Sequence, residues 1–207
     1  MSVVYVVRCN FSDPNRERDW NDWYSGPKIK QMLAKPFFRT GQRFRKGSGR
    51  GRNYLALWVL DSPEAFNTKE YTSDWGFFEW RPFVTDWSRD LFGGEGHSDA
   101  DFAVPAQGAL QVVSFDGMSL VDAAAARAAT EKSLPEVMWL PIIGLDRHTP
   151  IIGLRPMSDI ATSKVSGASL PAAAQEAIYR PISDFHPVKT VAAVRDAERR
   201  CLATRGI

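Results

Sequence analysis

Two short strings of this chain follow the same order of residue types: aromatic, Arg, Pro, apolar, hydroxyl, Asp, aromatic. They are Trp80–Trp87 and Tyr179–Phe185, and the second string is one residue shorter than the first. Roughly a hundred residues separate them, which is the length of a small domain. Because each string lies near the end of its half of the chain, the pattern predicts one α+β unit present twice. Two such halves can close around an internal cavity, where a functional site is then expected.

The order of the predicted elements supports this duplication. Runs of β-branched residues predict strands, and apolar residues at helical spacing predict helices. Asp13-Pro14 supplies the N-cap and the first position of a helix that Gly26-Pro27 must bend or interrupt. Residues 1–92 then have the order β-α-β-β-α-β, with strand 3–10, helix 13–35, strands 37–45 and 54–60, helix 62–71 and strand 83–91.

Residues 93–107 are rich in Gly, Ser, Asp, Pro and Ala, which predicts a linker. The same order of elements returns in residues 108–207. The elements there are strand 109–115, helix 119–132, strands 141–145 and 150–154, helix 170–177, strand 179–186 and a terminal helix 191–203. The sequence therefore predicts an α+β fold built from two ferredoxin-like repeats.

Composition argues against several classes of protein. Hydrophobic residues make up 44% of the chain and supply ample core, and the formal net charge of +2 is too small to imply a polyanionic partner. Cys9 and Cys201 have no metal-like spacing and do not suggest a disulfide framework. The first eight residues lack the basic segment of a signal peptide, and no apolar run approaches the roughly 20 residues that cross a membrane. We therefore expect a soluble, cytoplasmic protein without a membrane partner.

A basic segment is the main argument for nucleic-acid binding. Residues 39–52 contain six Lys or Arg and no acidic residue, next to aromatic residues. Ferredoxin-like sheets with such features bind single-stranded RNA. Residues 51–58 match the usual RNA-recognition strand signature poorly, however, and the near-neutral net charge also argues against this function. Walker, dinucleotide, His-Glu-x-x-His and nucleophile-elbow motifs are missing from the sequence, so we expect neither a cofactor nor serine or cysteine catalysis.

Four stretches of the first half carry a resemblance to a known family: Trp20–Tyr24, Lys35–Phe44, Tyr54–Leu60 and Ser62–Phe66. Across residues 1–92 the chain resembles the EthD-like and related families of the dimeric α/β-barrel superfamily. The resemblance implies two ferredoxin-like sheets that face each other, here within one fused chain. It also implies several activities, among them cofactor-free cyclases, lactone isomerases, decarboxylase-like enzymes, quinone-forming monooxygenases and haem proteins. The fold therefore does not fix the reaction.

One segment departs from that family. EthD-like proteins usually follow the Trp-Tyr pair with an acidic residue and a histidine, whereas this chain has Ser25–Lys28 at the corresponding place. A mechanism that relies on the helix histidine is therefore not expected, although the family resemblance itself remains.

Four residues are candidates for acid–base catalysis. His148 lies in the predicted turn between two strands and His186 at the end of the last strand, and histidine is the most economical proton carrier at neutral pH. Asp86, if desolvated in a cavity, would have a raised pKa and could accept a proton from carbon. Tyr24 could donate a hydrogen bond to an enolate-like oxygen. The structural alternatives are a water-facing turn or strand end for the histidines, an Arg–Asp pair for Asp86, and core packing for Tyr24.

Tryptophan and arginine residues are candidates for substrate binding. Trp58, Trp87 and Trp139 suit a flat apolar or aromatic ligand, although many aromatic residues must belong to the core. Arg43 could hold a substrate carboxylate or phenolate, or it could lie in a solvent-facing basic stripe. Arg81, in the repeated string, could likewise contact a substrate or pair with an aspartate.

These residues lead to a functional hypothesis. We expect a cofactor-independent acid–base enzyme, of isomerase, cyclase, dehydratase or lyase type, that acts on a small aromatic or polyketide-like substrate. One alternative is a haem-dependent enzyme with His148 or His186 as the axial ligand. Another is a barrel that binds a ligand without catalysis, for which the missing helix histidine is an argument. The fused barrel could also form a homodimer.

Overall fold

The computed structural model describes residues 3–159, 170 and 174–187. Its first half contains β1 (Val3–Phe11), α1 (Glu17–Trp23), α2 (Ile29–Leu33), β2 (Phe38–Gly49), β3 (Tyr54–Leu60), α3 (Lys69–Thr72) and β4 (Val84–Gly93). The second half contains β5 (Ala109–Ser114), α4 (Leu120–Glu131), β6 (Met138–Leu145), β7 (Ile151–Met157), β8 (Gln175–Pro181) and β9 (His186–Pro187).

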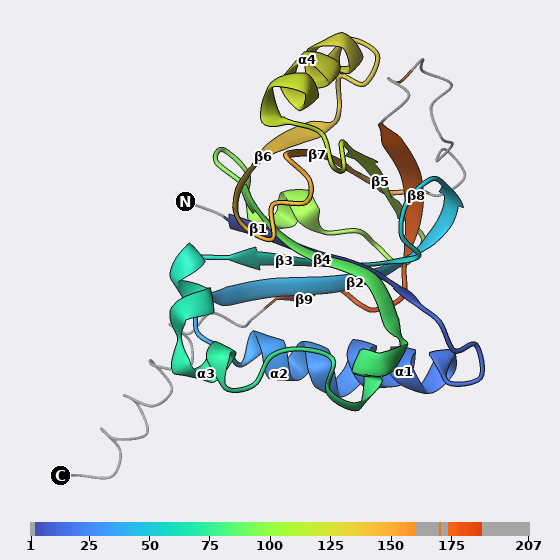
Figure 1. The fold of residues 1–207 in the computed structure, drawn as a ribbon, viewed down its shortest axis with the longest axis vertical. Coiled ribbons are helices and arrows are strands. Elements are labelled where there is room, and N and C mark those ends of the chain that lie inside the picture. The colour runs from blue at the N-terminus through green and yellow to red at the C-terminus, as the bar shows by residue number, and fades with distance from the viewer. Residues whose placement is uncertain (1–2, 160–169, 171–173, 188–207) are drawn as a thin grey trace, which may run out of the picture.

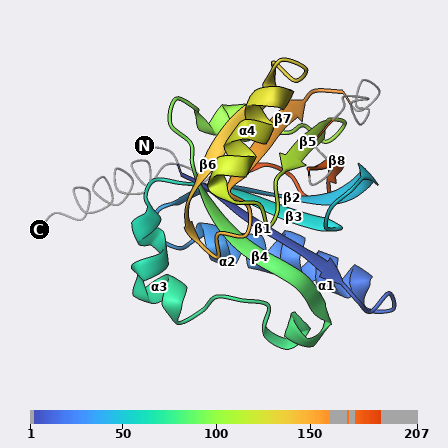
Figure 2. The same ribbon diagram turned by 45° about the horizontal axis from the view of Figure 1, so that its top comes forward.

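Eight strands of the described chain close into an antiparallel barrel. Their order is β3-β1-β4-β6-β7-β5-β8-β2, and β2 pairs back with β3. The two halves of the chain meet where β4 pairs with β6 and where the far end of β2 pairs with β8. The short β9 adds a second pairing to the beginning of β2. Helices α1 and α2 run along one side of the barrel, and α4 lies at the opposite end (Figure 1 and Figure 2).

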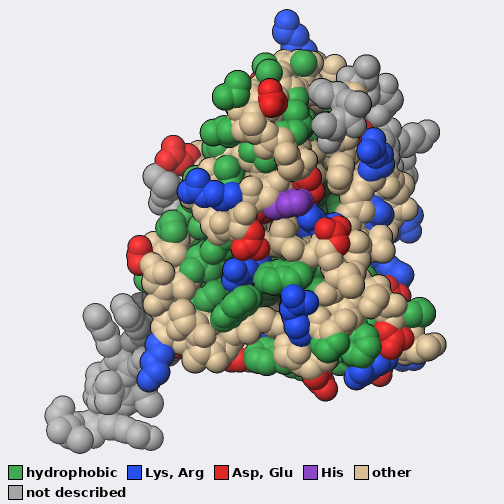
Figure 3. Space-filling view, viewed as in Figure 1, with side chains coloured by type: hydrophobic (Ala, Val, Ile, Leu, Met, Phe, Trp, Pro, Cys, Tyr) green, Lys and Arg blue, Asp and Glu red, His purple; other side chains and the backbone are tan. Residues whose placement is uncertain are grey.

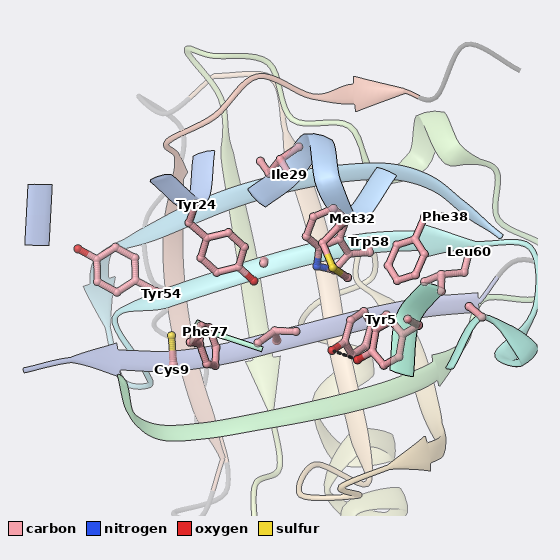
Figure 4. Packing of buried hydrophobic residues seen from close by; sticks show 14 of the residues in the cluster. Tyr5, Cys9, Tyr24, Ile29, Met32, Phe38, Tyr54, Trp58, Leu60 and Phe77 are labelled. Carbon is pink, nitrogen blue, oxygen red and sulfur yellow. Dashed lines mark hydrogen bonds between the residues drawn. The ribbon is translucent and has the colours of Figure 1, made fainter. Parts of the chain in front are cut away.

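Strands β1 and β3 are buried on both faces over most of their length, which explains the apolar run Val3–Val7 in β1. Val4 and Val6 point into the barrel, whereas Tyr5 lies on the outer face, under the helices. In β3 the same alternation sends Leu57 inward and Trp58 outward. The register pairs Tyr5 with Trp58, so these two side chains lie next to each other on the helix-facing surface (Figure 4).

The first predicted helix is interrupted where the sequence indicated. Between α1 and α2 the backbone forms a π-helical turn, Tyr24–Lys28, which contains Pro27. Proline lacks a backbone N–H and its ring crowds the preceding turn, so a wider local turn relieves both problems. As a result, Tyr24 and Lys28 are both buried against the sheet. None of the helices in the described residues is long and apolar enough to span a membrane.

The predicted linker, residues 93–107, is packed against the barrel. It contains a 3₁₀ turn, Asp99–Phe102, and it places Phe102 and Val104 in the cluster that fills the barrel interior. The side chain of Gln42 bonds to both backbone groups of Val104, donating to its carbonyl oxygen at 2.7 Å and accepting from its N–H at 3.1 Å. These contacts hold the segment in place.

The helix predicted for residues 170–177 is wrong at its end, because Gln175–Ala177 belong to β8. These residues pair with β5 on one side and with β2 on the other, and such tertiary pairing overrides the helical preference of an Ala-rich stretch. The predicted strand 179–186 accordingly begins and ends earlier, and His186 starts β9. Most of residues 170–177 and all of the predicted helix 191–203 lie outside the described residues.

An irregularity in β4 decides which side chains reach the helix-facing surface. The pairing of β4 with β1 shifts by one residue between Arg8 and Asn10, and Asp86 has a φ of 46° there. One extra residue in a strand reverses the alternation of the side chains that follow. After this bulge, Trp87 and Arg89 point to the helix side, while Asp90 points into the barrel.

Candidate functional site

A small cavity lies between the helix-facing surface of the first-half sheet and the elements that cover it, and we call it the aromatic pocket. Most of its wall is aromatic, with two cationic side chains, Lys28 and Arg89. The enclosed volume is about 30 Å³, which is room for one or two water molecules. The aromatic wall residues are Tyr5, Tyr24, Trp58, Tyr71, Trp75, Phe77 and Trp87. In Figure 4, Tyr24 and Met32 reach from the helical layer toward Tyr5 and Trp58 on the sheet.

The indole of Trp58 forms part of the pocket because its neighbour on β2 is a glycine. Gly41 pairs with Trp58, and a Cβ atom added to Gly41 would lie only 2.5 Å from Cε3 of that indole. The ring therefore lies flat on the glycine backbone. The indole Nε1 is buried and has no hydrogen-bond partner within the described part of the chain. An unpaired buried donor is costly, so a ligand oxygen that reached this N–H would gain a favourable hydrogen bond.

The tyrosines of the pocket are hydrogen-bond donors rather than bases. The hydroxyls of Tyr5 and Tyr71 lie 3.3 Å apart. Burial raises the pKa of Tyr5 well above its ordinary value, and the neighbouring Tyr71 raises it further. Burial also raises the pKa of Tyr24, against the opposing effect of the Arg43 guanidinium. The phenols of Tyr5 and Tyr24 therefore keep their protons at neutral pH.

Among the described residues of the pocket wall, Lys28 is the side chain that can lose a proton near neutral pH. It is 4% exposed, and burial lowers the pKa of its ammonium group to about 8. Its Nζ donates to the neutral Oε1 of Gln31 at 2.9 Å and lies 4.6 Å from the ring centre of Phe78. The nearby carboxylate of Asp74 is engaged elsewhere, since it accepts from Gln31 Nε2 at 2.5 Å and pairs with Lys35 at 3.6 Å.

Arg89 places a permanent positive charge on the opposite part of the wall. Its guanidinium lies 4.3 Å from the ring centre of Trp75 and 5.4 Å from that of Trp87. One terminal nitrogen donates to Asp146 Oδ1 at 3.2 Å. The Nε atom is buried and has no hydrogen-bond partner among the described residues. On the face in Figure 3, hydrophobic side chains gather over β4 and the segment before it, with Lys or Arg side chains beside them.

Three of the candidate residues from the sequence, Tyr24, Trp58 and Trp87, come together in this pocket. Arg81 lies in an adjoining groove, 5.3 Å from the ring centre of Trp87. Arg43 does not line the pocket. It is buried behind Tyr24, with its guanidinium 4.1 Å from the centre of that ring.

Arg43 instead ties the first helix to the sheet. It donates to the Asn21 backbone oxygen at 3.2 Å, to Asn21 Oδ1 at 3.0 Å and to Ser25 Oγ at 2.9 Å. The basic stripe predicted for β2 is thus divided: Arg43 is buried, while Arg45 reaches Glu17 at the surface.

His148 and Asp86 lie in a second cavity at one end of the barrel, which we call the polar pocket. Its volume is about 300 Å³, and its wall also contains Arg52 and Asp116. His148 Nε2 lies 3.6 Å from Asp116 Oδ2, and Arg52 pairs with both carboxylates at 3.3 Å. The charges of this pocket are therefore largely balanced by one another.

Behind the polar pocket lies a buried ionic network centred on Arg8, which is 2% exposed. Its guanidinium donates to Asp116 at 2.9 Å, to Ser114 at 3.1 Å and to Thr149, and it lies 3.7 Å from Asp90. Burial alone would raise the pKa of Asp116, but Arg8 and the Thr149 hydrogen bond outweigh it, so this pKa is lowered. The network joins β1, β4 and β5 to the turn before β7.

The last two candidates lie apart from both pockets. His186 sits on β9, opposite Gly41. Trp139 packs under α4, with its ring 5.9 Å from that of Phe115. Sequence reasoning missed Lys28, Arg89 and Tyr71 as site residues. For Lys28 a signal existed, because it stands in the segment where the EthD-like histidine is missing.

Neither pocket, in its described residues, fits a haem group. The described part of the aromatic pocket wall contains no histidine or cysteine, so it offers neither of these axial ligands. The polar pocket holds His148, but charged groups line it rather than the apolar walls a porphyrin needs. No cluster of His, Cys, Asp and Glu that could hold a metal ion occurs in the described residues.

No protein-family model matches the chain, and no curated protein matches it. Solved structures do share its fold. An anthrone oxidase-like protein superposes with a TM-score of 0.58 at 8% identity, over 91% of this chain and 94% of that chain. A candidate monooxygenase from Fusobacterium nucleatum subsp. nucleatum superposes with a TM-score of 0.54 at 9% identity, over 90% and 94% of the two chains. These likenesses establish the fold alone, a closed antiparallel barrel that fits the dimeric α/β-barrel type.

Proposed function

We propose that this chain is an enzyme that binds a flat aromatic ketone or phenol in the aromatic pocket and removes a proton from one of its carbon atoms, without a cofactor. The observation that carries the proposal is Lys28. Its amine is buried, lines the pocket and has no carboxylate in direct contact within the described residues. A buried lysine whose pKa falls toward neutrality is an effective general base.

In this mechanism the neutral amine of Lys28 takes a proton from a carbon that the carbonyl group of the substrate acidifies, either directly next to it or through a conjugated aromatic ring. The electron pair of that C–H bond moves toward the carbonyl oxygen, which becomes an enolate or phenolate. Arg89 offers a permanent positive charge, and the Trp58 N–H offers a donor for this oxygen. Donors that are fixed before the reaction in a weakly polar site stabilise such an anion strongly. The proton then returns to another atom of the substrate or to water.

Substrate entry requires the covering segment to move, because the enclosed cavity is smaller than an aromatic ring. The segment Trp75–Phe78 separates the cavity from two open grooves, of about 300 and 360 Å³. Gly76 has a φ of 106°, and a side chain there would meet nothing within 4 Å. Glycine gives this segment the conformational freedom to swing outward.

The fold supports a more specific family proposal. Within the first half the strand order is β4-β1-β3-β2, and within the second it is β6-β7-β5-β8. Each order places the first strand of its half between the third and the fourth, as in a ferredoxin-like sheet. We infer that the chain consists of two ferredoxin-like repeats and that it is an EthD-like member of the dimeric α/β-barrel superfamily.

Proton removal can lead to isomerisation, cyclisation or lyase-type cleavage. Oxygenation is a second candidate, favoured by the names of the two structural neighbours. An activated CH₂ group adjacent to aromatic rings would then react with O₂: one oxygen atom forms a new carbonyl group, and the other leaves as water with the two hydrogens. Both candidates need the same first step at Lys28.

The test uses anthrone, a flat tricyclic ketone with an acidic CH₂ group. In D₂O without oxygen, the protein should accelerate the exchange of these hydrogens for deuterium, which proton NMR measures. In air, an oxygen electrode measures O₂ consumption and so separates oxygenation from isomerase-type chemistry. Lys28→Met should lower the exchange rate at least tenfold, since general bases contribute about 10²–10⁴-fold. Lys35→Arg, a change at a buried lysine that is paired with Asp74, serves as the matched control. Unchanged exchange in Lys28→Met would refute the proposal.

A further inference from the structure

We propose that Lys28 is also a carbonyl-reactive amine, which forms a covalent imine with flat aromatic aldehydes. This inference rests on the proposed function in placing an aromatic carbonyl compound beside Lys28, but it concerns a different reaction of the same nitrogen. As a base, Lys28 takes a proton from carbon. As a nucleophile, its nitrogen bonds to the carbonyl carbon itself.

The surroundings of Lys28 differ from those of an ordinary structural lysine. Its Nζ has a neutral amide as hydrogen-bond partner, Gln31 Oε1, and lies over the faces of Phe78 and Trp23 at 4.6 and 5.9 Å. Lys35 is almost as buried, yet it lies 3.6 Å from the Asp74 carboxylate and donates to the Glu70 carbonyl oxygen at 2.5 Å. A direct carboxylate partner favours the charged ammonium form, which is not nucleophilic. Lys35 is therefore an internal control for the reactivity of Lys28.

A path to the amine is also present. Besides the aromatic pocket, Lys28 lines the open groove of about 360 Å³, whose wall includes Trp23, Gln31, Asp74 and Phe78. That volume lies in the range of small-molecule sites. An aldehyde whose ring stacks on Trp23 or Phe78 would bring its carbonyl carbon to the Lys28 nitrogen without any change in the enclosed cavity.

The reaction balances without a further reagent. The Lys28 nitrogen attacks the carbonyl carbon and gives a carbinolamine, in which the former carbonyl oxygen is a hydroxyl. Loss of that hydroxyl and of an amine hydrogen as water forms the C=N bond. Solvent in the open groove can carry the protons between nitrogen and oxygen. Added borohydride then delivers hydride to the imine carbon and fixes the adduct as a secondary amine.

The experiment uses 4-hydroxybenzaldehyde with cyanoborohydride on the full-length protein, followed by intact mass measurement and peptide mapping. One adduct is expected, on Lys28, at least tenfold above any other lysine. Its yield should rise as the pH increases through about 8, because the neutral amine is the reactive form. Lys28→Arg should lose the adduct, and Lys35→Arg should keep it.

The peptide map of the protein without substitutions tests the imine proposal even if a variant folds poorly. Labelling spread evenly over the surface lysines would overturn the inference, and so would an adduct on Lys35 at the level of Lys28. The two proposals fail separately. Lys28-dependent exchange of anthrone without an adduct would refute the imine and leave the base, whereas an adduct without exchange would refute the base and leave the imine.

Discussion

Gly41 is the position where the smallest change should damage the aromatic pocket most. It pairs with Trp58 on β3 and with His186 on β9, so its backbone is held from both sides. In Gly41→Ala the new Cβ would lie 2.5 Å from Trp58 Cε3, where carbon atoms normally stay about 3.5–4.0 Å apart. The indole must therefore move by roughly 1 Å, and the enclosed space of the pocket lies on its free face.

The expected size of the effect follows from this overlap. Overpacking a core by one methyl group costs about 1–3 kcal/mol. In a chain of this size each kcal/mol lowers the melting temperature by about 2–4 °C. We therefore expect Gly41→Ala to melt about 2–12 °C below the unchanged protein. The displaced indole would fill the pocket, so binding of anthrone, measured by quenching of tryptophan fluorescence, should also weaken markedly.

The second half of the chain offers a matched control. Gly153 on β7 pairs with Trp139 on β6, and an added Cβ there would lie 2.7 Å from the Trp139 ring and 2.6 Å from Val137. Gly153→Ala should therefore destabilise the protein to a similar degree, yet leave anthrone binding unchanged, because Trp139 lies under α4.

Gly26→Ala serves as a control of the opposite sign. Gly26 is at a helical position where an added Cβ would meet nothing within 4 Å, so the free energy of unfolding should rise by about 0.5–1 kcal/mol.

The assay is thermal unfolding followed by circular dichroism, with anthrone titrations at a temperature where all variants are folded. Equal loss of binding in Gly41→Ala and Gly153→Ala would show that general destabilisation, and not the position of the Trp58 indole, governs the pocket. A Gly41→Ala protein that binds normally would refute the assignment of Trp58 to the binding site.

Three further predictions concern buried polar or titratable groups. Arg8→Met should cost about 3–5 kcal/mol in urea unfolding, because it leaves Asp90 and Asp116 buried without their cation; a loss below 1 kcal/mol would contradict this. The pKa of Asp116 is lowered in the folded state. The stability that this carboxylate contributes is therefore complete above about pH 4 and is lost as the pH falls through its pKa in the folded protein. Asp116→Asn should flatten the acid side of a plot of unfolding free energy against pH. Burial raises the pKa of Cys9 to about 12, so iodoacetamide should label this thiol only as fast as the protein unfolds, and rapid labelling of the folded protein would contradict its burial.

Local signals in the sequence predicted most elements of the fold, whereas the closure of the barrel required information that no local signal contains. The apolar run of β1 and the Gly26-Pro27 pair identified a buried strand and an interrupted helix, because burial on both faces and a missing N–H are properties of single segments. The pairings of β4 with β6 and of β2 with β8 join residues far apart in the chain. Each of these pairings also contains a register shift, as does the pairing of β4 with β1 at Asp86, and no local sequence pattern predicts these shifts.

The same reasoning explains which site residues the sequence revealed. Trp58 and Trp87 stand out because large aromatic side chains are rare and apolar, whatever surrounds them. Lys28 and Arg89 do not stand out in the sequence, because an isolated cation in a helix or strand is usually solvated. They belong to a pocket only because residues 71–78 pack over them in the folded protein. His148 and Asp86 were each predicted as catalytic candidates, yet the sequence could not show that they would share one pocket with Asp116 and Arg52.

The pairing of charges separates the two pockets by role. In the polar pocket and the ionic network behind it, Arg8 and Arg52 face Asp86, Asp90 and Asp116, and each cation has a carboxylate within 3.3 Å. Such matched charges stabilise a fold but give up their reactivity to one another. Lys28 is buried to the same extent, and yet its closest polar partner is the amide of Gln31. Among the described residues, no carboxylate pairs directly with Lys28, and the pocket also holds an unpaired indole N–H. A substrate that becomes an anion beside this cation is therefore stabilised, which is the physical reason to look for catalysis at Lys28 before His148.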